Sequence, residues 1–179
     1  MGPNTNVNIC EILKNSLLNI LEQHSFLFLD PLPEDDIFAY LKKLKKENNL
    51  QDKDYLCIKM NFVCDNKNGT FTLYLSVDCA VEIEANLLGK DIDEVDINQC
   101  CKDGDSAKEI LNILSANILN EIYGSKPQRN LSIPECMKIS FIKVIENINK
   151  VDVRDSDNKK NFIASMIINQ YPILLHLNF

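Results

Sequence analysis

A carboxylate and an amide stand three residues apart near the middle of the chain, at Glu109 and Asn112. Within a helix, side chains at this spacing are neighbours on one surface. A carboxylate can pair with a cation, and an amide both accepts and donates hydrogen bonds, so together they could anchor a partner and orient a water molecule. In the simpler alternative, Glu109 only caps the helix and Asn112 is an ordinary polar residue on a solvated face. Both interpretations require a helix at this position.

The stretch from Asp103 to Gly124 has the pattern of such a helix. Ser106 and Glu109 have the spacing of a capping box, and Gly124 stands where a C-terminal cap is expected. At about 100° per residue, the apolar side chains share one face, namely Ala107, Ile110, Leu111, Leu114, Ile118 and Ile122. The opposite face carries the polar set and one alanine, namely Asp105, Glu109, Asn112, Ala116 and Asn120. The predicted helix therefore packs by one side and exposes Glu109 and Asn112 on the other.

The chain has 179 residues, enough for one domain with a sizeable hydrophobic core. Its net charge of -7 argues against nucleic-acid binding and against attraction to anionic membranes. No run of about 18 apolar residues and no secretory signal pattern is present, so we expect a cytoplasmic protein without membrane contact. The seven cysteines form no Cys-x-x-Cys pair, and an unrelated metal or thiol enzyme therefore has no supporting spacing.

The remaining pattern predicts an α+β domain with a largely antiparallel sheet. Helices are expected at 9–24, 34–46 and 80–88, the last capped by Asp78, with an acidic loop at 90–105. Hairpins are expected at 55–63 with 70–77, around a turn at 66–69, and at 161–169 with 172–179. The stretch 136–144 is ambiguous between strand and helix, and 151–154 could form a short strand.

Two helical stretches resemble each other in sequence. Residues 11–22 (EILKNSLLNILE) and 109–120 (EILNILSANILN) agree at six of twelve positions. Two amphipathic helices rich in Leu and Ile can match by accident. Alternatively, an internal duplication built a single domain from two similar halves, at about 9–89 and 103–179, with both helices lying on one sheet.

The spacing Asp105-x3-Glu109-x2-Asn112, followed by 21 residues and Pro134, resembles the signature of the CheX/CheC family of chemotaxis phosphatases. The resemblance extends over most of the chain and implies a pseudo-two-fold domain with long helices packed on an antiparallel sheet. In the first of the two similar helices, Glu11 is followed by Lys14, which cannot act as an amide does. The chain therefore resembles the CheX-like members, which keep a single site. One departure from the usual family pattern is Lys108, where a glycine is common.

The resemblance implies that the protein hydrolyses the aspartyl phosphate of a response-regulator receiver domain. Asn112 would orient the attacking water, Glu109 would pair with a lysine of the receiver, and Asp105 would shape the helix start. No cofactor is expected in this chain, because Mg²⁺ would be held by the receiver. Relatives of the CheX type form dimers through their sheets, and the strand at 161–169 could serve a homodimer. The alternative is a non-catalytic module that binds a receiver domain or another signalling partner through the same helix face.

Overall fold

The computed structural model describes residues 8–32, 37–46, 53–125, 128–153, 160–169 and 171–179. Within these ranges seven strands form one sheet in the order β1-β6-β7-β3-β2-β4, and β5 also pairs with β2. Every pairing is antiparallel, which confirms the predicted α+β class. The strands are β1 (Asp30–Pro31), β2 (Asp54–Cys64), β3 (Lys67–Ser76), β4 (Arg129–Leu131), β5 (Glu135–Ser140), β6 (Asn161–Ile168) and β7 (Tyr171–Asn178).

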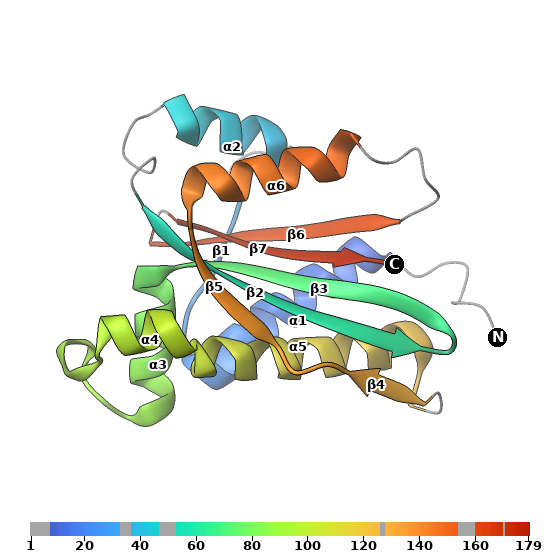
Figure 1. Ribbon diagram of the computed structural model, residues 1–179, viewed down its shortest axis with the longest axis horizontal. Helices are drawn as coiled ribbons and strands as arrows, with labels where there is room; N and C mark the ends of the chain where they lie inside the picture. The colour runs from blue at the N-terminus through green and yellow to red at the C-terminus, as the bar shows by residue number, and fades with distance from the viewer. Residues whose placement is uncertain (1–7, 33–36, 47–52, 126–127, 154–159, 170) are drawn as a thin grey trace.

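Helices cover both faces of the sheet (Figure 1). One layer contains α1 (Ile9–Ser25), α3 (Val77–Leu88), α4 (Ile97–Asp103) and α5 (Asp105–Tyr123), with the 3-10 turn η1 (Ile92–Glu94) between α3 and α4. The opposite layer contains α2 (Ile37–Lys46) and α6 (Phe141–Val153). Helices α1 and α5, which hold the two similar sequence stretches, pack against each other in the same layer. The internal duplication itself stays a prediction.

Alternating side chains of β2 divide the core between these two layers, because neighbouring residues of a strand point to opposite faces. Leu56 and Ile58 join the larger cluster, which includes α1, α3 and α5. Tyr55 and Cys57 join the smaller cluster beneath α2 and α6. There the rings of Tyr55 and Phe141 stack with their centroids 5.4 Å apart. The first half of β2 is therefore buried on both faces, whereas Lys59, Asn61 and Val63 in its second half are exposed.

The first hairpin confirms the prediction, with a tighter turn than expected. Cys64 pairs with Lys67, so the turn consists of Asp65 and Asn66 instead of residues 66–69. Both turn residues have positive φ, of 51° and 63°. Asp and Asn tolerate this conformation, and it matches the twist of a two-residue hairpin. The C-terminal hairpin of β6 and β7 also forms as predicted.

Three local predictions need correction, and one stretch left open between strand and helix contains both. Ser76 caps α3 in place of Asp78, because its side chain accepts a hydrogen bond from the backbone N–H of Cys79. The predicted acidic loop contains η1 and α4, and the Asp96 side chain caps α4 by accepting from two backbone N–H groups. The ambiguous stretch divides into the strand β5 and the start of α6. Residues 151–153 continue α6 and form no strand.

Some predicted segments fall on residues outside the described ranges, namely 34–36 at the start of the second helix, Arg154 at the end of the expected short strand, and Gln170, which is expected with Tyr171 in the turn of the C-terminal hairpin. Of the helices in the described ranges, none combines the length and the apolar character needed to cross a bilayer.

Candidate functional site

Helix α5 begins two residues earlier than the capping-box spacing predicts. Gly104 adopts a left-handed conformation, with φ of 59°, and serves both as the C-cap of α4 and as the N-cap of α5. Its N–H donates to the carbonyl of Cys100 at 2.9 Å, and its own carbonyl accepts from the N–H of Lys108 at 2.8 Å. Because glycine permits this direct turn between helices, Ser106 lies inside α5 and no side chain caps the helix. The predicted capping box is therefore wrong, whereas Gly124 ends the helix as expected.

The two faces of α5 are those that the sequence predicts. All six predicted apolar residues are buried, together with Ser115 and Leu119. The Ser115 hydroxyl donates to the carbonyl of Leu111 at 2.7 Å, so this buried polar group is satisfied. Glu109 is exposed and Asn112 is half-buried on the opposite side. The helix therefore holds these two side chains in a fixed position while its apolar face packs against the sheet.

Glu109 and Asn112 are free to bind a partner. Within the described ranges neither side chain makes a hydrogen bond or an ion pair. Their i,i+3 spacing makes them neighbours on the helix surface. A carboxylate that accepts hydrogen bonds therefore stands beside an amide that both donates and accepts them. This freedom removes the simpler interpretation of Glu109 as a capping residue.

Asp105 lies in the first turn of α5, as expected for a residue that shapes the helix start. Its carboxylate forms an ion pair with the ammonium of Lys108 at 3.2 Å. Asp105 is the more exposed partner, and Lys108 lies partly against the protein surface. The pair therefore places a positive charge one helical turn before Asn112.

Pro134 is buried in the link between β4 and β5. The segment that contains it runs beside α5 and is fixed at both ends. The guanidinium of Arg129 donates to the side chain of Asn120 and to the carbonyl of Gly124, near the end of α5. At the other end, a Cβ on Gly104 would lie 2.5 Å from the Sγ of Cys136. The structure thus places Pro134 in a segment that flanks the Glu109–Asn112 surface.

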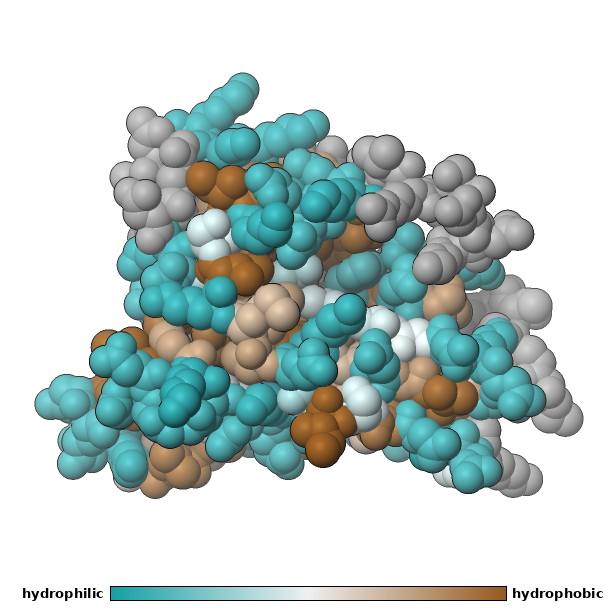
Figure 2. All heavy atoms as spheres, in the orientation of Figure 1, coloured by the Kyte–Doolittle hydropathy of each residue, from teal (hydrophilic) through white to brown (hydrophobic). Residues whose placement is uncertain are grey.

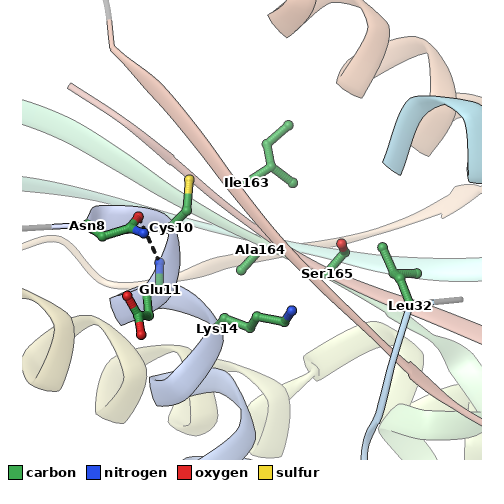
Figure 3. A pocket seen from close by; sticks show the side chains of 8 residues that line it. All are labelled: Asn8, Cys10, Glu11, Lys14, Leu32, Ile163, Ala164 and Ser165. Carbon is green, nitrogen blue, oxygen red and sulfur yellow. Dashed lines mark hydrogen bonds between the residues drawn. The ribbon is translucent and has the colours of Figure 1, made fainter. Parts of the chain in front are cut away.

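The equivalent positions of the first similar helix carry a different pair. Glu11 and Lys14 line an open pocket of about 370 Å³ between α1 and β6. Figure 3 shows the Lys14 side chain extending across the gap toward Ser165 and Leu32, while Glu11 points the other way. A lysine ammonium donates hydrogen bonds and accepts none, so this pair cannot hold a water molecule by both of its polar ends as an amide could. Of these two similar helices, α5 carries a carboxylate and an amide at the matched positions, and α1 carries a carboxylate and a lysine.

The buried cysteines lack the features of catalytic thiols. All seven are unpaired, and burial raises the pKa of Cys57 to about 11 and that of Cys100 to about 12. Burial also raises the pKa of the Cys136 thiol, although the nearby charge of Lys108 opposes this shift. Thiols of this kind stay protonated at neutral pH and are weak nucleophiles. Within the described ranges, no group of three or more His, Cys, Asp or Glu side chains is arranged to hold a metal ion.

Neither the known protein-family models nor the curated proteins contain a match to this sequence. Solved structures do resemble the chain. Chemotaxis protein CheX from Vibrio vulnificus is 14% identical with a TM-score of 0.64, and the match covers 97% of both chains. A CheC-like superfamily protein from Shewanella sp. PV-4 is 14% identical with a TM-score of 0.61, covering 97% of this chain and 98% of that one.

A chain of the CheX–CheY–BeF3–Mg²⁺ complex from Borrelia burgdorferi is 10% identical with a TM-score of 0.56, and the match covers 97% of both chains. At these identities the likeness establishes the fold. The chain has the CheX/CheC-like fold over nearly its whole length, which confirms the resemblance at the level of architecture.

Proposed function

We propose that this protein hydrolyses the aspartyl phosphate of a response-regulator receiver domain. The observation that carries the proposal is the unpartnered Glu109–Asn112 pair on the exposed side of α5, in a chain with the CheX/CheC-like fold. The similarity to a chain of the CheX–CheY complex supports a receiver domain as the partner. A rigid helix can place both side chains at the phosphoryl group of a docked domain.

In this proposal the protein forms no covalent bond to the phosphoryl group. Phosphoryl transfer depends mainly on positioning the nucleophile and on stabilising charge. The receiver supplies the phosphoryl group, its own acidic residues and the Mg²⁺ ion. The Asn112 amide orients a water molecule for in-line attack, using its oxygen as acceptor and its nitrogen as donor. Glu109 pairs with a lysine of the receiver and fixes the approach of the helix.

The cellular setting follows from the same proposal. A phosphorylated receiver domain is a cytoplasmic partner, and the net charge of -7 does not favour nucleic acid or anionic membrane surfaces. A homodimer through the sheet, with β6 as the pairing strand, belongs to the proposal as well. Strand β1 pairs only with Met166 and Ile167 of β6, so the backbone edge of β6 from 161 to 165 has no partner strand within the described ranges.

A second candidate is a module that binds the receiver without hydrolysing its phosphate. Lys108 favours it, because an ammonium one turn before Asn112 can hold the phosphoryl group by charge alone. The two candidates differ in one measurement, the lifetime of the aspartyl phosphate. We expect purified receiver domains from the same genome to lose phosphate faster with this protein. A receiver that binds the protein and keeps its normal phosphate lifetime would favour the module.

A further inference from the structure

Ile133 is the most exposed large apolar side chain in the described part of the chain, with 87% of its surface accessible. It immediately precedes Pro134, which is buried. Figure 2 shows an apolar protrusion at the lower edge of this face, over the segment that joins β4 to β5. A single exposed apolar residue is ordinary on a protein surface. The position of Ile133 relative to α5 is the reason to consider it further.

The segment 129–136 lies along one row of α5 side chains. Gly104, Lys108, Asn112, Ala116 and Asn120 follow one another at four-residue spacing and form this row. The segment contacts both ends of the row, through Cys136 at Gly104 and through Arg129 at Asn120. Glu109 lies about 60° farther round the helix than Asn112, away from the segment. Asn112 is therefore the central member of the row and lies between the segment and Glu109.

Element lengths place Ile133 level with Asn112. Between Gly104 and Asn120 the helix rises about 24 Å, at about 1.5 Å per residue. An extended chain from Arg129 to Cys136 also covers about 24 Å, at about 3.4 Å per residue. Ile133 is four residues from Arg129 and thus about 14 Å along this path, opposite the turn that holds Leu111 and Asn112. The exposed isoleucine and the carboxylate of Glu109 therefore flank the amide on its two sides.

We infer that Ile133 is a docking residue that contacts an apolar side chain of the receiver domain beside its phosphorylation site. The inference rests on the proposed function and adds a determinant of partner choice to it. The chain carries a net charge of -7, and the receiver also has acidic residues around its phosphoryl group. An apolar contact gives affinity without adding to this like-charge repulsion. A small phosphorylated molecule bound at Asn112 would not need this contact, whereas a folded domain covers it.

The test compares Ile133→Ala with Phe28→Ala, using a receiver that the wild-type protein dephosphorylates. Phe28 is a matched control because it is 83% exposed and lies between α1 and β1, at the other edge of the sheet. Both variants should keep the wild-type unfolding midpoint, since neither side chain is buried. We expect Ile133→Ala to raise KM, and the Kd for the BeF3-activated receiver, about tenfold with kcat unchanged. Phe28→Ala should match the wild type.

Failure of the docking role and failure of the proposed function give different results in this experiment. Wild-type values for Ile133→Ala would overturn the docking role and leave the phosphatase standing. A lower kcat with unchanged KM would also overturn it, because a docking contact acts on binding. If the wild-type protein neither binds nor dephosphorylates any receiver of its genome, the proposed function falls and this inference falls with it.

Discussion

Gly104 fixes the start of α5, and its replacement by alanine should cost far more stability than the same change at Gly89. Both glycines end a helix in the left-handed conformation, with φ of 59° and 62°. A Cβ at Gly89 would meet nothing within 4 Å, whereas a Cβ at Gly104 would lie 2.5 Å from the Sγ and 3.0 Å from the Cβ of Cys136. The pair therefore separates backbone strain from steric overlap.

The magnitudes follow from these two terms. Forcing a residue with a Cβ into the left-handed region costs about 1 to 2 kcal/mol, and both variants have this cost. Overlap with a half-buried side chain adds about 1 to 3 kcal/mol at Gly104 alone. We therefore expect Gly89→Ala to lower the free energy of unfolding by about 1 to 2 kcal/mol and Gly104→Ala by about 2 to 5 kcal/mol.

Urea unfolding of the two variants and the wild type measures this difference directly. In a Cys136→Ala background the Sγ is absent, and the cost of Gly104→Ala should fall by at least about 1 kcal/mol. Equal costs for Gly89→Ala and Gly104→Ala would refute the close approach of Gly104, at the start of α5, to Cys136 of β5. An unchanged cost in the Cys136→Ala background would refute the specific contact with the thiol.

Three further predictions concern other residues. Glu109→Ala should change the free energy of unfolding by less than about 0.5 kcal/mol, because Glu109 caps no helix end. The same variant should bind the receiver about tenfold more weakly or worse. A large loss of stability in urea unfolding would contradict the absence of a capping role. Burial lowers the pKa of His176 from 6.5 to about 4, so its unfolded form takes up a proton first as pH falls. Wild-type stability should therefore decline between about pH 6.5 and pH 4 by up to about 3 kcal/mol more than that of His176→Gln. Parallel pH curves would contradict a neutral, partly buried histidine. The buried Tyr55 hydroxyl has no hydrogen-bond partner within the described ranges. Tyr55→Phe should therefore leave the free energy of unfolding unchanged or raise it by about 1 kcal/mol. A measured loss of stability would contradict this prediction and show that the hydroxyl does have a partner.

Periodic patterns made the main elements predictable. The buried face of α5 follows from its apolar spacing, and all six residues predicted for it are buried. Both hairpins follow from alternation between turn residues. These features depend on local sequence and on burial of one face, and the sequence shows both directly.

Local capping and the site surroundings were harder to predict. Ser106 has the residue type of a cap, yet Gly104 starts α5 because α4, a short helix with no apolar periodicity, ends there. Without α4 the role of Gly104 could not be inferred. The inferred position of Ile133 level with Asn112 depends on contacts of Arg129 with the end of α5 and of Cys136 with Gly104, which join residues distant in the sequence. In the sequence alone, an isoleucine before a proline does not indicate a docking residue.

The most direct test of the central claim is a single-turnover measurement of phosphate loss from the cognate phosphorylated receiver, with this protein in saturating excess. We predict that the wild type accelerates the loss and that Asn112→Ala reduces the acceleration at least about a hundredfold. The variant should keep its fold and its affinity for the BeF3-activated receiver, since alanine is a good helix former and the Asn112 side chain makes no hydrogen bond within the described ranges. Equal rates for the wild type and Asn112→Ala would contradict the assignment of the water-orienting role to this amide.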